Sequence, residues 1–383
     1  MLKNRKTVKF LKFVFVLAAV VFLSPGSALA DGVTDTEVLI GSTTPLSGPA
    51  AVWGIGSTKA AQIRFDEANA DGGVHGRQIR FIVEDSQYQV PLAVRAVNKL
   101  IERDGVFALF AVQGTPHNLA IKDRAFSENV PLLMPFSLAE SLQTPQEPLK
   151  ITWGSSYYDQ VRQAIRDLHE TNGRDKVCIM YQDTEYGEEV LRATEDEVEA
   201  LGLEIVTKAG HKPNATEFTG TMTGFKSSGC NLVVMGTVIR DTIIGYKTGR
   251  ALGMEADFAT TAAGVDTTVS ANGTDGLYGY GVTAMPAEAQ ASEFFAAYKS
   301  ATDDTPGFPA LLGYIMADLF VEALDNAGRD LTPESLIAGF EAIRDHENPF
   351  GVETSSYSAD NHRGLNTVVP MIVEGGNWVP ISR

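Results

Sequence analysis

The chain lacks several features that would assign it to a common functional class. Its 48 acidic residues outnumber its 31 basic residues, which gives a formal net charge of −17 and argues against nucleic acid and anionic lipid as partners. After residue 23, no apolar run approaches the roughly 20 residues that span a bilayer. The sequence therefore predicts no nucleic-acid partner and no membrane-embedded bundle, and its charge favours a soluble monomer.

Motifs for catalysis and for metal or cofactor binding are also missing. The sequence has no Gly-x-Ser-x-Gly elbow, no His-Glu-x-x-His pair and no Gly-Lys-Ser/Thr phosphate loop. The stretch GIGSTK at 54–59 lacks the third glycine of a dinucleotide-binding loop, and the six histidines show no metal-ligand spacing. Acidic residues after Asp66 lead into a glycine pair, which is typical of a helix end rather than a calcium loop. We therefore expect no enzyme, no metal and no cofactor.

Cysteine is scarce. Cys178 and Cys230 are the only two, and each lies in or beside an apolar run that is typical of a strand. In an oxidising compartment they could pair. Buried cysteines also behave as small hydrophobic residues, and pairing needs a close approach of the two Cβ atoms that a sequence does not display. Between these alternatives we favour free thiols.

The first 30 residues have the pattern of a secretory signal. A basic start, an apolar run over 13–23 and an Ala-Leu-Ala end indicate an exported chain that is cut before Asp31. The apolar run is too short for a membrane anchor. Removal of this segment takes away five basic residues, so the formal charge falls from −17 to −22.

From Val38 onward, short apolar runs alternate with longer segments of helical periodicity. Continuous apolar strands between helices indicate parallel sheets that are covered on both faces. The predicted strands of the first series are 38–43, 79–85, 106–112 and 130–136, and its helices are 57–70, 91–104 and 115–129. A second series starts after Lys150, with predicted strands at 176–183, 204–210, 231–237 and 257–261 and helices at 158–173, 188–202, 217–229 and 240–253. Two such series predict an α/β protein with two doubly wound parallel-sheet lobes.

A mainly helical segment at 289–345 follows the second series, and a short β-rich tail begins at Phe350. Helices that arrive this late are needed to complete the first lobe, so we expect the chain to cross between lobes near 152, 282 and 350. Several crossings form a hinge rather than a loose linker. The expected units are a signal segment at 1–30, an N-terminal lobe of 31–152 and 283–350, and a C-terminal lobe of 153–282 and 351–383.

Five stretches of the chain together resemble one known family. They are VLIGSTTPLSGPAAVWGIG, NADGGVHGRQIRFIVED, AVNKLI, VPLLMP and YGEEVL. The set is similar to the periplasmic solute-binding proteins of the branched-chain amino acid type, which serve ABC importers, and the similarity runs from about Glu37 to the C-terminus. The resemblance implies a type I periplasmic-binding fold, in which two lobes close on a solute between the carboxyl ends of their strands. That position agrees with the rule for open α/β sheets.

The resemblance also implies which residues hold the solute. Thr115 and the loop of Phe136, Ser137 and Leu138 would receive a ligand carboxylate, because the start of a helix suits an anion. Tyr186 would close over the solute from the second lobe. We expect Thr115 also to act as the cap of its helix, with the following proline at the first helical position.

Trp53 stands among small residues after the first predicted strand. The resemblance places this loop at the cleft, where a rigid indole would form a wall over the side chain of the solute. The alternative is a core tryptophan that anchors the next helix, and we favour the cleft. Trp153 and Tyr157 are weaker candidates near the first crossing.

Two departures from the family pattern concern the ammonium group of an amino acid. Family members that bind amino acids usually carry an acid just after the strand at 257–261, and this chain has none before Asp266. Val238 stands where the family often has a tyrosine. The candidate residues in the first of these loops are Ala263, Gly264 and Asp266. A buried, unpaired ammonium would cost several kcal/mol. Either another acid such as Asp241 pairs with it, or the natural solute has no ammonium.

The sequence therefore predicts a non-enzymatic periplasmic protein that delivers a branched-chain or aromatic amino acid, or a related small carboxylate, to an ABC permease in the inner membrane. A periplasmic sensor for an amide, urea or an aromatic acid is the alternative. An enzyme is disfavoured because no catalytic set is recognisable.

Overall fold

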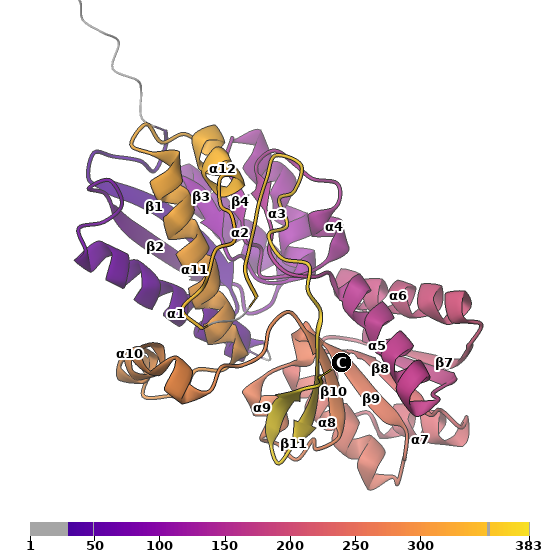
Figure 1. Cartoon of the computed structure of the whole chain (residues 1–383). Coiled ribbons are helices and arrows are strands. Elements are labelled where there is room, and N and C mark those ends of the chain that lie inside the picture. The colour runs from indigo at the N-terminus through magenta and orange to yellow at the C-terminus, as the bar shows by residue number, and fades with distance from the viewer. Residues whose placement is uncertain (1–29, 49, 351–352, 383) are drawn as a thin grey trace, which may run out of the picture.

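The computed structural model describes residues 30–48, 50–350 and 353–382, and it has two lobes (Figure 1). The predicted signal segment lies outside the described residues, apart from Ala30. Within the described ranges, no helix combines the length and the apolar character that a membrane crossing requires. Each lobe is built on its own β-sheet with helices packed on it.

The sheet of the first lobe has five parallel strands in the order β2-β1-β3-β4-β5. The strands are β1 (Glu37–Thr44), β2 (Gln78–Asp85), β3 (Ala108–Phe110), β4 (Leu132–Leu133) and β5 (Lys150–Ile151). Strand β1 is buried from Val38 onward, which explains its continuous apolar run. The chain passes from β1 out to β2 and then back across β1 to β3. This reversal makes the sheet doubly wound, as predicted.

Four helices follow the strands of this lobe. They are α1 (Ala51–Ala70), α2 (Val90–Lys99), α3 (Thr115–Ser127) and α4 (Glu140–Gln143). A π-helical turn over Leu100–Asp104 extends α2, and Gly105 ends it with a φ of 64°. A left-handed glycine is a common helix terminator, so the predicted end of this helix is confirmed.

Helix α1 begins six residues earlier than predicted, at Ala51 rather than at Ser57. Gly54 and Gly56 lie in its first turns, and glycine is a poor helix former. A Cβ atom on Gly54 would lie 2.1 Å from the carbonyl oxygen of Pro45, so the helix starts where the backbone of the preceding loop leaves no room for a side chain. Tertiary packing therefore overrides the local propensity.

The sheet of the second lobe has seven strands in the order β12-β11-β10-β9-β8-β6-β7. The strands are β6 (Lys176–Gln182), β7 (Glu204–His211), β8 (Leu232–Gly236), β9 (Asp257–Thr261), β10 (Leu277–Gly281), β11 (Val369–Glu374) and β12 (Asn377–Pro380). Pairing is parallel from β7 to β10, and β11 and β12 add an antiparallel edge. The helices are α5 (Tyr157–Asn172), α6 (Glu185–Leu201), α7 (Thr219–Ser227), α8 (Ile239–Ala251) and α9 (Thr267–Ser270), with a 3-10 turn at Ala262–Gly264.

Cys178 and Cys230 form a disulfide, so the expectation of free thiols is wrong. Cys178 lies on β6 beside Val233 of β8, and Cys230 stands just before β8. The two Cα atoms are 5.8 Å apart, within the span of a disulfide. The two strands are neighbours in the sheet although β7 separates them along the chain, and the sequence pattern alone does not reveal this adjacency.

Three late helices pack on the first lobe: α10 (Ser292–Thr302), α11 (Phe308–Ala327) and α12 (Pro333–Glu341), with a 3-10 turn at Glu288–Gln290 before α10. Helix α11 lies along α1 (Figure 1). Arg64 of α1 bonds to Asp318 of α11 at 2.6 Å, and Tyr314 donates a hydrogen bond to Glu67 at 2.6 Å. A Cβ atom on Gly313 would lie 2.2 Å from a carbonyl oxygen of α1, so the two helices are in close backbone contact.

Four phenylalanines form the centre of the first lobe. Phe65 of α1 and Phe320 of α11 have ring centroids 5.8 Å apart, and both rings pack on Phe110 of β3 at 5.5–5.6 Å. Phe81 of β2 closes the group. Tilted aromatic pairs at these distances add stabilisation beyond the burial of area. The core of this lobe therefore includes a helix that comes late in the chain.

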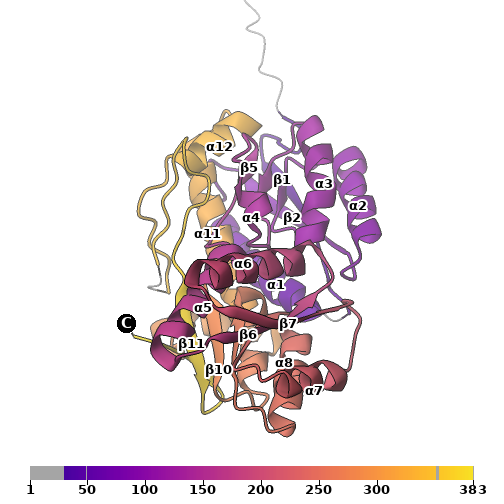
Figure 2. The ribbon, with the colours of Figure 1, turned by 90° about the vertical axis from the view of Figure 1, so that its right-hand side faces the viewer.

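After α12 the chain first runs beside the sheet of the first lobe. The carbonyl of His362 accepts a hydrogen bond from Thr152 N–H at 2.8 Å, and Ser355 forms a bridge with His346. The chain then enters the second sheet as β11 and β12, which lie in the lower lobe in the view of Figure 2. The last crossing between the sheets thus falls shortly before Val369.

Candidate ligand-binding site

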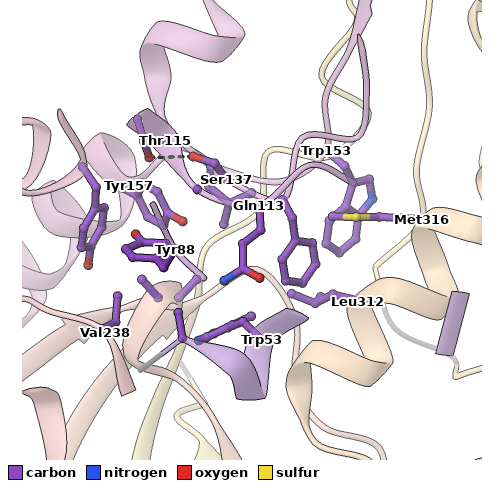
Figure 3. A pocket seen from close by; sticks show the side chains of 17 residues that line it. Trp53, Tyr88, Gln113, Thr115, Ser137, Trp153, Tyr157, Val238, Leu312 and Met316 are labelled. Atoms are coloured by element: carbon purple, nitrogen blue, oxygen red, sulfur yellow. Dashed lines mark hydrogen bonds between the residues drawn. The ribbon is translucent and has the colours of Figure 1, made fainter. Parts of the chain in front are cut away.

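A pocket lies where the two lobes face each other (Figure 3). The space between its lining atoms is about 630 Å³, open solvent included. Its lining residues are Ala50, Trp53, Tyr88, Gln113, Gly114, Thr115, Phe136, Ser137, Leu138, Trp153, Tyr157, Tyr186, Val238, Ala262, Ala263, Leu312 and Met316. Both sheets contribute to it.

Most of the lining follows the carboxyl ends of parallel strands. In the first lobe these are the segments after β1, β2, β3, β4 and β5, and in the second lobe the segments after β6, β8 and β9. Leu312 and Met316 are the exceptions among the lining residues, because they come from the middle of α11. Strand ends at a doubly wound sheet are where open α/β folds bind ligands.

Eight of the ten predicted site residues line this pocket. They are Trp53, Thr115, Phe136, Ser137, Leu138, Tyr186, Val238 and Ala263. Gly264 and Asp266 do not line it. Gly264 packs against Thr260, whose Oγ1 would lie 2.2 Å from an added Cβ atom. Asp266 is buried as the cap of α9, where its Oδ1 accepts a hydrogen bond from Thr268 N–H at 2.7 Å.

Trp53 combines the two roles that the sequence left as alternatives. It lies in the first turn of α1, is 8% exposed and belongs to the core cluster of the lobe. It also lines the pocket, where its indole packs on Phe136 with ring centroids 5.5 Å apart. One face of the residue therefore supports the helix, and another is available to a solute. Its role in binding stays a prediction.

The start of α3 provides hydrogen-bond donors. The N-cap is Gly114 rather than Thr115, so the predicted capping role is wrong, and Pro116 follows at the second helical position. Gly114 has a φ of 99°, and a Cβ atom there would lie 2.4 Å from the ring of His117. Only glycine fits this turn. Thr115 is thereby moved into the first turn, where its Oγ1 lies 2.8 Å from Ser137 Oγ.

Gln113, which was not among the predicted site residues, adds an amide to this group of donors. The residue is 6% exposed, and its Oε1 accepts a hydrogen bond from Thr44 Oγ1 at 2.8 Å. That bond turns Nε2 toward the centre of the pocket (Figure 3), and within the described residues Nε2 has no hydrogen-bond partner. A buried N–H₂ group that lines a cavity is suited to an acceptor on a ligand.

Tyrosines form the side of the pocket that faces the second lobe. Tyr157 and Tyr186 are in edge contact, with centroids 4.8 Å apart. The Tyr186 hydroxyl is already engaged, because it bonds to Thr261 Oγ1 at 2.9 Å and to the carbonyl of Thr237 at 3.2 Å. Burial raises the pKa of both phenols, so they are neutral at physiological pH.

Tyr88 completes the aromatic group from the loop after β2. Its ring packs on His117 at 4.8 Å between centroids. Burial raises the pKa of Tyr88 to about 12, and burial lowers the pKa of His117 to about 4. Both groups are therefore uncharged near neutral pH, and His117 supplies no cation behind the tyrosine wall.

The seventeen lining residues include no Asp, Glu, Lys, Arg or His. Asp241, the acid considered from the sequence, is fully buried outside the lining. Its Oδ1 accepts a hydrogen bond from Arg240 Nε at 2.8 Å, and its Oδ2 lies 4.0 Å from Nδ1 of His211. Oδ1 is thus paired inside the second lobe, and Oδ2 is buried without a hydrogen-bond partner among the described residues. Among the described residues, no group of His, Cys, Asp and Glu is placed to hold a metal ion.

A buried carboxylate joins the lobes beside the pocket. Glu189 of α6 accepts hydrogen bonds from the N–H of Glu140, at the start of α4, and from the N–H of Tyr158, at the start of α5, each at 3.0 Å. Helix starts favour an anion. Burial nevertheless raises the pKa of Glu189 to about 7, against the lowering effect of these donors. Arg192 forms an ion pair with Glu140 across the same contact.

A family model described as "Periplasmic binding protein" matches residues 37–377. The chain belongs to this family. Its fold is that of a type I periplasmic binding protein, and the proteins similar to it, which include Leu/Ile/Val-binding protein homologs, are substrate-binding proteins rather than enzymes. The resemblance and the fold class predicted from the sequence are thereby confirmed.

Three similar proteins illustrate the group. A Leu/Ile/Val-binding protein homolog 8 from Brucella abortus is 24% identical over 377 residues, with 90% of each chain covered. A branched-chain amino acid ABC transporter structure from Thermus thermophilus with bound valine has a TM-score of 0.82 at 18% identity, and covers 92% of this chain and 97% of its own. A fatty acid ABC transporter substrate-binding protein from Thermomonospora curvata has a TM-score of 0.82 at 21% identity, with 93% and 94% covered.

Several lining residues of this periplasmic binding protein were not predicted from the sequence. Tyr88 and Gln113 follow predicted strands, so the strand-end rule would have indicated their segments. Leu312 and Met316 carry no such signal, because apolar residues at a spacing of four on a helix are typical of a core. Trp153 and Tyr157, the weaker candidates, do line the pocket.

Proposed function

We propose that this protein is the periplasmic solute-binding component of an ABC importer and that it holds a small, carboxylate-bearing solute in the pocket between its lobes. The observation that carries the proposal is the convergence of strand ends from both sheets on one pocket, with hydrogen-bond donors on one side and aromatic rings around them. The solute class that we propose is a branched-chain or aromatic amino acid or a related small carboxylate.

Each part of the pocket has a role in this proposal. The hydroxyls of Thr115 and Ser137 and the free N–H groups at the start of α3 receive the carboxylate. Trp53 and Tyr186 enclose the apolar part of the solute from opposite lobes. Leu138, Phe136, Val238 and Ala263 contribute apolar surface around it.

The proposed mechanism is a population shift rather than a reaction. We propose a first lobe of residues 31–152 and 283–350, continued to about Leu365 by the hydrogen bonds of that segment, and a second lobe formed by the rest of the mature chain. A solute that contacts both lobes binds the closed form more tightly than the open form, so occupancy increases the closed population. A permease in the inner membrane then detects the closed form.

A ligand screen on Trp53→Ala and a matched variant tests the binding site. Trp378 is also 8% exposed but lies on β12, outside the pocket. We expect both Trp→Ala variants to lose stability, roughly 3–5 kcal/mol for a large aromatic side chain in a core. Binding is measured by calorimetry on protein that has been unfolded, dialysed and refolded without ligand, against small carboxylates and amino acids.

Only Trp53→Ala should lose solute affinity, because Trp53 lines the pocket and Trp378 does not. Equal loss in Trp378→Ala, or full affinity in Trp53→Ala, would contradict the proposed site. Uptake of the bound solute by cells with and without the gene for this chain tests the importer role. Uptake that does not depend on the chain would refute that role and would favour the sensor.

A further inference from the structure

The pocket has donors for an anion but no acceptor with a negative charge for a cation. We propose that the natural solute is an apolar monocarboxylate that carries no amino group. The inference rests on the proposed function, since it names the class of solute that the same pocket selects. It separates this chain from relatives whose names state that they bind amino acids.

The side-chain donors all come from the first lobe's side of the pocket. Thr115 Oγ1 and Ser137 Oγ lie 2.8 Å apart beside the first turn of α3. The Gln113 Nε2 group points into the same cavity (Figure 3), with its Oε1 already occupied by Thr44. A carboxylate has only acceptor atoms, so it can use all of these donors. A primary amide has one acceptor oxygen and two N–H donors of its own, so it can use fewer of these donors.

No acid lines the pocket to pair with an ammonium group. Asp241 is outside the lining and already pairs with Arg240, and Asp266 is used as the cap of α9. Glu189 accepts backbone hydrogen bonds at the contact of α4 and α5 and is likewise outside the lining. Asp266, Glu189 and one oxygen of Asp241 are thus engaged with other groups.

The lining from the second lobe is apolar where an ammonium would need acceptors. Val238, Ala262 and Ala263 face the cavity there. The hydroxyl of Tyr186 is committed to the Thr261 side chain and the Thr237 carbonyl. An ammonium enclosed by these groups loses its water and gains no charged partner, which is strongly unfavourable.

Aromatic rings alone attract cations weakly unless the cation is fully desolvated between their faces. Tyr157 meets Tyr186 edge to face, which turns one ring edge toward the other ring. The apolar chain of a carboxylic acid packs equally well on a ring face or a ring edge. The aromatic wall therefore suits an apolar tail better than it suits a charged head.

Matched pairs of solutes test the inference on ligand-free wild-type protein. The pairs are 4-methylpentanoate with leucine and 3-phenylpropanoate with phenylalanine, each of which differs only by the amino group. Calorimetry gives the dissociation constants at pH 7.5. We expect the amino acid of the tighter-binding pair to bind at least 100-fold more weakly than its deaminated partner.

The inference would be overturned if, in the tighter-binding pair, the dissociation constant of the amino acid were less than 100 times that of the deaminated acid, or if the amino acid bound more tightly. Either result would leave the proposed function intact. Absence of binding by all four compounds at millimolar concentration would overturn the proposed function as well. 3-Phenylpropanamide separates the carboxylate from a neutral amide, and an amide that binds as tightly as the acid would contradict the assignment of the anion.

Two variants locate the effect. Gln113→Glu places a negative charge where the amide donor was, so it should weaken 3-phenylpropanoate at least 30-fold and 3-phenylpropanamide less. Asp241→Asn removes the acid that the sequence offered as the ammonium partner and should leave the ratio of dissociation constants within each pair unchanged. A melting temperature for each ligand-free variant shows that it is folded. If Asp241→Asn selectively weakened the amino acids, Asp241 would be their partner and the inference would fail.

Discussion

Glu189 provides the sharpest test of the electrostatics beside the pocket. Burial raises its pKa to about 7 from an ordinary value of 4.5. A carboxyl group with a raised pKa in the folded state binds protons more tightly there than in the unfolded chain. Stability therefore falls as pH rises from about 4.5 to about 7. The difference between the two pKa values corresponds to on the order of 3 kcal/mol.

Glu189→Gln removes this titration and keeps an oxygen that accepts from Glu140 N–H or Tyr158 N–H. Relative to wild type, the variant should gain about 3 kcal/mol of unfolding free energy between pH 4.5 and pH 8. The assay is urea unfolding of ligand-free protein, followed by tryptophan fluorescence at intervals of half a pH unit. Glu188→Gln is the matched control, because Glu188 is the exposed neighbour on the same helix.

The difference between variant and wild type is the quantity to measure, because His117 titrates in the same range with the opposite sign. Its pKa of about 4 means that the folded state loses stability as pH falls from 6.5 toward 4. A difference curve that is flat for Glu189→Gln would refute the raised pKa. A curve that falls with pH would show that the backbone donors stabilise the carboxylate more than burial destabilises it.

Three further changes have defined outcomes. Burial lowers the pKa of His346, but the carboxylates of Asp318 and Glu322 on α11 outweigh burial and raise the pKa above its ordinary value. Stability that is present below pH 6.5 is therefore lost as pH rises through the raised pKa. His346→Gln should flatten this loss, which urea unfolding at pH 6 and 9 checks. The double variant Cys178→Ala, Cys230→Ala should lose roughly 2–4 kcal/mol, which denaturant midpoints measure, and an unchanged midpoint would contradict a formed disulfide. Gly313→Ala should cost about 1–3 kcal/mol through its clash with a carbonyl of α1, whereas Gly220→Ala, with open space around it in α7, should not lower the melting temperature.

Much of the fold follows from local patterns. The strands at 79–85 and 257–261 and the helix end at Gly105 are found within a residue or two of their predicted places. In these segments an apolar run or a left-handed glycine acts over a few neighbouring residues. The predictions fail where contacts between segments that are distant in the sequence determine the local structure. Helix α1 starts early because the Pro45 backbone requires glycine at position 54.

The residues of the candidate site also fall into those that local patterns predict and those that depend on distant contacts. Residues after strand ends, such as Phe136 and Val238, were within reach of a family resemblance and the strand-end rule. Met316 reaches the pocket from a helix whose placement depends on its packing against α1, which no local pattern encodes. Asp266 was a reasonable candidate by charge, but its short side chain caps its own helix instead.

The contact between α1 and α11 has a consequence for how the protein is made. Phe65 is in place early in synthesis, whereas its neighbour Phe320 follows only after the whole parallel part of the second sheet. A fragment that stops before Phe308 would leave the apolar flank of α1 open to water and prone to aggregation. The non-local closure also raises the contact order, which slows folding. Neither half is thus a contiguous, separately expressible piece, and a circularly permuted chain that starts near residue 285 would join α11 to α1 earliest.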